Sequence, residues 1–191
     1  MHTFYTFEYD LGLWSFGAVQ VLKERSTGRL KTCKTVQKAL LSDPPACWRR
    51  LAQVKELRHP LLGALTEVLE DLQHFYLISP RIDGGELADW LDSLEEDDMI
   101  EEETCSAYVA QVLAVLTHCH ALGIYHHDLR PNNVLLTSRE PDASVVVSDM
   151  GIAPALDPQR KLSKASGSHL APELRAPEAV GDSQADIWSV G

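Results

Sequence analysis

One polar stretch, followed at once by an apolar run, constrains this chain more than any other part of its sequence. Residues 125–133 read Tyr-His-His-Asp-Leu-Arg-Pro-Asn-Asn, and the run Val-Leu-Leu at 134–136 comes directly after them. A short apolar run of this kind predicts a buried strand, so the polar residues before it are expected in a loop. The loop presents a carboxylate (Asp128), a cation (Arg130) and an amide (Asn133).

These three side chains are the kinds of group that phosphoryl transfer requires. A carboxylate orients or deprotonates the attacking hydroxyl, a cation offsets charge on the moving phosphoryl group, and an amide oxygen helps to hold magnesium. The alternative is a polar turn that ends a helix and enters a strand without any catalytic role. Chance rarely supplies all three groups at this spacing, so the pattern favours catalysis.

The stretch resembles the catalytic loop of the eukaryotic protein kinases, which opens with H-R-D-L and ends on an asparagine. Asp128 and Asn133 match this pattern, while His127 replaces the arginine and Arg130 stands where Ser/Thr kinases usually carry lysine. The resemblance implies that Asp128 is the catalytic base, Arg130 a phosphate-facing cation and Asn133 a magnesium ligand.

Residues 1–40 are expected to form strands around a second motif. Gly12, Gly17 and Val19 match the kinase glycine-rich loop, in which glycines let backbone amides approach the phosphates of ATP. Trp14 takes the place of the middle glycine and is expected to narrow the nucleotide site. An ordinary β-hairpin is the alternative interpretation.

Lys34, in the next strand-like run, matches the family lysine that pairs with the α- and β-phosphates. A solvated strand lysine is the alternative. In the family this lysine also pairs with a glutamate on the following helix, which is expected here over about 43–57. The residue at the glutamate's place is Arg50, so the resemblance implies that the pair is lost or substituted, with like charges opposing the usual geometry.

Two further strands are expected at 61–70 and 74–79, before a stretch at 80–85 that resembles the hinge between the kinase lobes. The resemblance implies that adenine bonds the carbonyl of Pro80 and the amide and carbonyl of Ile82, since proline lacks only the donor.

Ser79 and Glu86 flank this hinge. Ser79 falls at the gatekeeper position, where a small side chain leaves room behind the adenine. Glu86 resembles the residue that meets the ribose or a basic substrate side chain. Its alternative is an ordinary acid at the start of a helix, where the helix dipole favours negative charge.

A long helix is expected after the acidic run at 95–103 and before Gly123. The acids are interpreted mainly as a solvated helix start, with a dedicated binding patch as the alternative. Histidines follow at His118, His120, His126 and His127. A metal site there is the less favoured alternative, because no cysteine or carboxylate completes a ligand spacing.

A hairpin over 133–137 and 145–147 is expected to deliver Asp149, which resembles the magnesium-binding aspartate of the D-F-G motif with Met150 in place of phenylalanine. The interval from Asp128 and the intervening connection are most similar to those of calcium-dependent and calmodulin-dependent kinases. The sequence has no EF-hand loop, so calcium control within the chain is not predicted.

Residues 152–170 are interpreted as a polar activation segment whose serines are candidates for phosphorylation, although His127 replaces the usual phosphate-clamping arginine. The anchoring A-P-E motif occurs twice, and either Glu173 or Glu178 is a candidate for the anchor. Asp186 resembles the aspartate that braces the backbone of the catalytic loop from the central helix of the family.

Composition limits the partners. A formal net charge of -11 argues against nucleic acid or an anionic membrane and favours basic protein substrates, while 45% hydrophobic content suffices for a core. The cysteines show no C-x-x-C pairing, and the N-terminus has no secretory pattern. Free thiols in the cytoplasm, or alternatively the nucleus, are therefore expected.

Together these motifs predict an α+β, bilobal kinase-like fold across 1–191, with an N-lobe at 1–79, a hinge at 80–85 and a C-lobe at 86–191. The family domain continues through further helices, so the C-lobe is expected to be incomplete. Pro131, after Arg130, resembles the L-K-P-x-N loops of Ser/Thr kinases, and the family resemblance implies that the protein uses ATP and Mg2+. The alternatives are a pseudokinase scaffold and, less favoured, a small-molecule kinase of similar fold.

Overall fold

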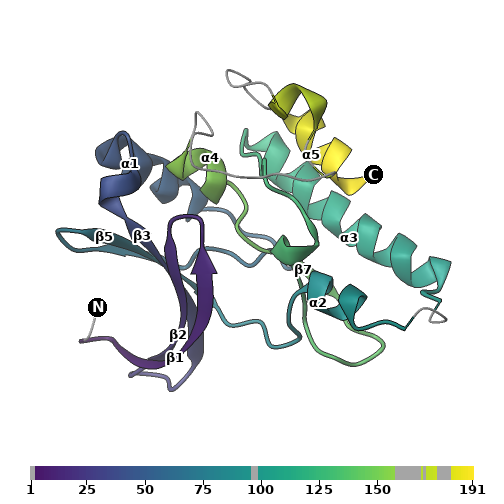
Figure 1. Ribbon diagram of the computed structural model, residues 1–191, viewed down its shortest axis with the longest axis horizontal. Coiled ribbons are helices and arrows are strands. Elements are labelled where there is room, and N and C mark those ends of the chain that lie inside the picture. Colours follow the sequence, from purple (N-terminus) through teal and green to yellow (C-terminus); the bar gives the residue numbers. More distant parts are fainter. Residues whose placement is uncertain (1–2, 96–98, 158–168, 170, 176–181) are drawn as a thin grey trace.

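The computed structural model describes residues 3–95, 99–157, 169, 171–175 and 182–191. A twisted sheet and one helix form the first lobe, and helices with a small hairpin form the second (Figure 1). The predicted α+β, bilobal architecture is therefore confirmed.

Five antiparallel strands build the first lobe in the order β1-β2-β3-β5-β4. They are β1 (Tyr5–Trp14), β2 (Gly17–Glu24), β3 (Leu30–Gln37), β4 (Glu67–Glu70) and β5 (His74–Pro80). A tight turn joins β1 to β2, so Trp14 pairs directly with Gly17, and Lys34 of β3 lies opposite Val19. The sheet thus places both sequence motifs of the first lobe side by side.

The expectation of a strand over 61–70 is wrong for its first half. β4 begins only at Glu67, because the preceding backbone bonds to the other lobe. The amide of Gly63 donates to the carbonyl of Val147 at 2.8 Å, and the amide of Val147 donates to the carbonyl of Leu61 at 2.9 Å. This segment therefore ties the two lobes together instead of extending the sheet.

The helix α1 (Pro44–Val54) starts where the sequence predicts, with Asp43 as N-cap accepting from the amide of Ala46 at 2.9 Å. It ends at Val54, a turn earlier than expected. Its buried face carries Cys47, Leu51 and Val54, whereas Arg50 is exposed. The helix therefore packs through apolar side chains and holds its arginine in solvent.

The second lobe contains four α-helices within the described residues and one two-stranded sheet. They are α2 (Leu87–Asp92), α3 (Glu102–Ala121), α4 (Ile152–Leu156), α5 (Ser183–Val190), β6 (Val134–Leu136) and β7 (Val145–Val147). β6 and β7 form the predicted hairpin, with Val134 opposite Val147. No helix in the described part of the chain has the length and apolar character needed to cross a bilayer.

The helix α3 confirms the predicted long helix. Two acids of the acidic run, Glu102 and Glu103, occupy its first turn, where the helix dipole favours them. The helix buries Val112, Val115, Leu116 and Cys119, and Gly123 follows its end with φ +72°. A positive φ favours glycine, which explains the stop.

The segment after Gly151 differs from the predicted polar loop. Residues 152–156 form α4, because Ile152, Ala155 and Leu156 share one helix face and are buried, and α4 packs against α1 (Figure 1). Of the two A-P-E motifs, residues 171–173 are described. The candidate phosphorylation serines and the second A-P-E motif lie outside the described residues.

One continuous core crosses both lobes. Leu51 of α1, Leu77 of β5, Leu116 of α3 and Val147 of β7 belong to the same cluster of buried side chains. A smaller cluster of Tyr5, Leu22, Cys33 and Ile78 lies apart from it. This core joins the five-stranded sheet, α1 and the β6–β7 hairpin. It therefore fixes how Lys34 of β3 faces the loops that flank β6 and β7.

Two neighbouring positions of α1 test this packing. Leu51→Ala should lower the free energy of unfolding by about 2–5 kcal/mol, because a fully buried leucine leaves a cavity. The matched control Arg50→Ala, on the exposed face, should stay within about 0.5 kcal/mol. Urea unfolding of both variants measures this. Equal losses would contradict the described orientation of α1.

Candidate active site

The carboxylate of Asp186 on α5 holds the backbone of the predicted catalytic loop, residues 126–133. It accepts hydrogen bonds from the amide of His126 at 2.8 Å and the amide of His127 at 2.7 Å, and it contacts His120 Nε2 at 2.7 Å. Asp186 is only 1% exposed. The bracing role that the sequence predicts for Asp186 is confirmed, and it holds His127 at a φ of 58°.

The ring of His126 links this loop to the residue before Asp149. Its Nδ1 accepts from the amide of Asp128 at 3.3 Å, so its Nε2 carries the proton and donates to the carbonyl of Ser148 at 2.9 Å. His126 is therefore a fully buried connector between the catalytic loop and Ser148.

Asn133 organises the catalytic loop from its other end. Its Nδ2 donates to the carbonyl of Asp128 at 2.7 Å and lies 3.3 Å from Asp128 Oδ2, while its own carbonyl accepts from Ser148. With Nδ2 used in this way, Oδ1 is the side-chain atom able to bind a cation. Arg130 Nε lies 4.0 Å from Asp128 Oδ2. The predicted base, cation and amide thus lie together.

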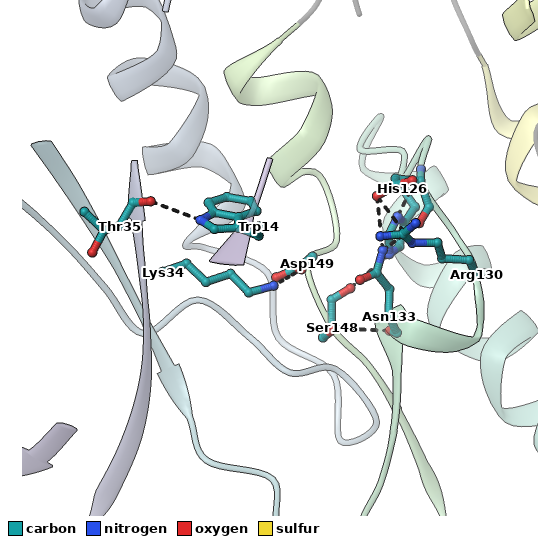
Figure 2. A network of polar contacts seen from close by, with 9 residues as sticks. Trp14, Lys34, Thr35, His126, Arg130, Asn133, Ser148 and Asp149 are labelled. Atoms are coloured by element: carbon teal, nitrogen blue, oxygen red, sulfur yellow. Dashed lines mark hydrogen bonds and ion pairs between the residues drawn. The ribbon is translucent and has the colours of Figure 1, made fainter. Parts of the chain in front are cut away.

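Lys34 reaches across the interlobe space and forms an ion pair with Asp149 (Figure 2). Lys34 therefore has a different partner from the glutamate that the family uses. Asp149 pairs with the lysine, and Arg50, which stands at the glutamate's place, stays exposed on α1. Asp149 has a φ of 58°, and Gly151 has a φ of 73°. A Cβ at Gly151 would lie 2.6 Å from Ile124 Cγ2, so this position admits only glycine.

The glycine positions of the β1–β2 hairpin have separate structural reasons. Gly12 has a φ of 139°, which favours glycine. A Cβ at Gly17 would lie 2.3 Å from the carbonyl oxygen of Thr35, so Gly17 lets the hairpin approach β3. The sequence predicts that both glycines let the backbone approach the phosphates of ATP. The structure adds a second reason for glycine at position 17, because this residue lies in close contact with β3.

A cavity of about 770 Å³ lies between the lobes. Every residue that the sequence predicts for catalysis, nucleotide binding or magnesium binding lines this cavity except Gly17. The hinge residues Pro80 and Ile82 lie on its wall together with Lys34, Asp128 and Asp149. The structure therefore brings together groups that are far apart in the sequence.

Sequence reasoning missed several residues of this cavity, among them Arg81, Asp89, Leu135 and Ser148. A signal existed for Leu135, because Val134 and Leu136 of β6 are buried and the residue between them must face the other way. Ser148 carried no such signal. Its hydrogen bonds to Asn133 and from His126 arise only from the fold.

Glu86 lies at the start of α2, as its alternative interpretation as a helix-start acid predicts, and it also bonds to the catalytic loop. It stands at the N-cap position of α2 but makes no side-chain capping bond. Its Oε2 accepts instead from Asn132 Nδ2 of the catalytic loop at 2.9 Å. Glu86 therefore connects the hinge to the catalytic loop and still lines the cavity.

The buried cysteines are not activated nucleophiles. Burial raises the pKa of Cys33 to about 12, and burial together with the Asp186 carboxylate raises that of Cys119 to about 11. Burial also raises the pKa of Cys47. These thiols are protonated at neutral pH, so the chemistry of the site belongs to its carboxylates and cations.

The structure has a β-rich lobe and a helical lobe, and a lysine and two aspartates face the cavity between them. This arrangement defines a protein-kinase-like protein. Residues 5–191 match the sequence model of the protein kinase domain. This chain therefore belongs to the protein kinase domain family.

Curated relatives agree with this family. Calcium/calmodulin-dependent protein kinase type 1B of Rattus norvegicus is 32% identical over 190 residues, which cover 98% of this chain and 54% of that protein. Calcium-dependent protein kinase 5 of Plasmodium berghei (strain Anka) is 30% identical over 186 residues, covering 96% of this chain and 32% of that protein. The chain thus spans about half the length of the first relatives. The predicted likeness to this kinase group is confirmed.

The brace at Asp186 can be tested directly. Asp186→Asn replaces an acceptor oxygen by a donor, so it should lower the free energy of unfolding by about 1.5–3 kcal/mol. Hydrogen exchange at the amides of His126 and His127 should quicken. The control is Asp182→Asn, because Asp182 is an exposed N-cap of α5 and asparagine caps equally well. Unchanged protection of both amides in Asp186→Asn would contradict the brace.

Proposed function

We propose that this chain is the kinase domain of a protein serine/threonine kinase, which transfers the γ-phosphate of ATP to a hydroxyl of a protein substrate. The observation that carries the proposal is the convergence of Lys34, Asp128, Asn133 and Asp149 on one cavity. Family membership supports it, although a fold by itself does not establish activity.

The residues of this cavity fit ATP and magnesium. Its volume of about 770 Å³ lies within the range of ordinary ligand sites. Asp149 and Asn133 offer the oxygen ligands that Mg2+ prefers, and Lys34 offers a cation for the α- and β-phosphates. When bound, the magnesium ion neutralises charge on the transferring phosphates. Pro80 and Ile82, which also line the cavity, offer backbone groups to the adenine.

Asp128 is proposed to accept the proton of the substrate hydroxyl and to aim that oxygen at the phosphate. The contacts of Asn133 with its backbone and carboxylate orient it, so little reorganisation is needed during transfer. Arg130 is 45% exposed, which leaves its guanidinium free to turn toward a phosphate as an offsetting charge.

Substrates are proposed to be basic around the phosphorylated residue. Glu86 and Asp89 line the cavity, and the whole chain carries a formal net charge of -11. Such a surface attracts cationic peptides and repels nucleic acid and anionic membranes. Pro131, after Arg130, favours serine and threonine as acceptors by its likeness to loops of that class. We place this activity in the cytoplasm or the nucleus.

A pseudokinase is the second candidate function, and a specific observation favours it. Lys34 and Asp149, the two charges assigned to phosphate and magnesium, are paired with each other, and Trp14 lies against the lysine (Figure 2). A scaffold of this kind would act through its surface. ATP binding without measurable transfer by a folded protein would favour this candidate.

Asp128→Asn tests the catalytic assignment. Loss of the base should lower phosphate transfer to a basic Ser/Thr peptide by about 10²–10⁴-fold, while ATP affinity stays nearly unchanged because the base touches the acceptor hydroxyl. Radiolabelled phosphate transfer and a thermal-shift titration with ATP and Mg2+ measure the two quantities. The control is Asp142→Asn, an exposed aspartate in the β6–β7 connection. Equal activity of Asp128→Asn and the unchanged protein would remove Asp128 from its role.

A further inference from the structure

The indole of Trp14 is anchored inside the cavity rather than directed into solvent. Trp14 is the last residue of β1, and its Nε1 donates a hydrogen bond to the carbonyl of Thr35 on β3 at 3.0 Å. The ring also packs against the core that crosses both lobes. Its neighbour Leu13, by contrast, is 87% exposed. The hairpin tip therefore turns one large side chain inward and the adjacent one outward.

Lys34 lies against this indole. Its Nζ is 5.1 Å from the centre of the Trp14 ring and is ion-paired with Asp149 (Figure 2). A cation over an indole face is attracted by the ring, and the attraction grows when the pair is withdrawn from water. One side chain thus stabilises the arrangement in which lysine and aspartate satisfy each other.

The remainder of the hairpin tip locks the indole in place. Phe16 is 3% exposed, its ring centre is 5.0 Å from that of Trp14, and its carbonyl accepts from the amide of Gln37 at 3.2 Å. The same Thr35 carbonyl that binds the indole also requires glycine at position 17. Trp14, Phe16 and Gly17 therefore dock the tip on β3 as one unit.

We infer that Trp14 gates the phosphate end of the nucleotide cavity, because the docked indole and the phosphates of ATP exclude each other. This inference rests on the nucleotide site proposed above. The phosphates need Lys34 and Asp149, which the docked tip holds together. Adenosine, which has no phosphate, needs only the hinge wall at Pro80 and Ile82. The gate therefore discriminates against phosphorylated nucleotides and not against the nucleoside.

This gate predicts a specific pattern of affinities. The apparent dissociation constant is the intrinsic one divided by the fraction of molecules with the tip undocked. Trp14→Gly, which has no indole to dock, should tighten binding of ATP with Mg2+ by about tenfold or more, whereas adenosine binding should change by less than about twofold. Isothermal titration calorimetry of the full chain measures both.

Glu8→Gly is the matched control, because it introduces the same backbone freedom in β1 at an exposed residue that does not line the cavity. It should leave ATP affinity unchanged. A second measurement uses the unchanged protein and is independent of how Trp14→Gly folds. The indole N–H signal of Trp14, assigned through its loss in Trp14→Phe, should be protected from hydrogen exchange. Saturating ATP and Mg2+ should remove this protection, and adenosine should not.

Each outcome separates the gate from the nucleotide site. Equal ATP affinity in the unchanged protein and Trp14→Gly, or an equal gain for ATP and adenosine, would overturn the gate and leave the nucleotide site standing. Protection that survives saturating ATP would also overturn the gate. No binding of either ligand to either folded protein would overturn both. Tighter ATP binding by Trp14→Gly without phosphate transfer would uphold the gate and count against the proposed catalysis.

Discussion

The buried carboxylate of Asp186 is the interaction on which the rest of the site depends. A buried charge is tolerated only where hydrogen bonds replace its hydration, and here two backbone amides and the ring of His120 do so. The contact fixes His127 in an uncommon backbone conformation and so sets the direction of Asp128. It also links α5 and, through His120, α3 to the catalytic loop.

From this brace, a chain of hydrogen bonds runs toward the other lobe. His126 reaches the carbonyl of Ser148, and Ser148 bonds back to the carbonyl of Asn133, so the catalytic loop and the residue before Asp149 form one unit. Asp149 then meets Lys34 across the cavity. This ion pair thus adds a polar link between the lobes to the shared core and the backbone bonds of Leu61 and Gly63 to β7.

The two candidate functions differ in what this ion pair does. In the proposed kinase, Lys34 serves the phosphates and Asp149 the magnesium ion, whereas in the proposed scaffold the two serve only each other. Trp14 bears on this difference directly, because it stabilises the paired arrangement through Lys34 and the carbonyl of Thr35. The two proposed functions therefore differ at the same few side chains, within a family whose fold permits both.

Local patterns determined much of this protein from its sequence alone. Asp43 caps α1, the periodic apolar residues define α3, and the residues around Asp128 identify the catalytic loop, because each signal depends on neighbours within a few turns. Tertiary structure decided the rest. Lys34 and Asp149 are 115 residues apart, Leu61 and Gly63 bond to β7 instead of the sheet, and Trp14 turns inward onto β3. Such contacts depend on how distant elements pack, which no local pattern encodes.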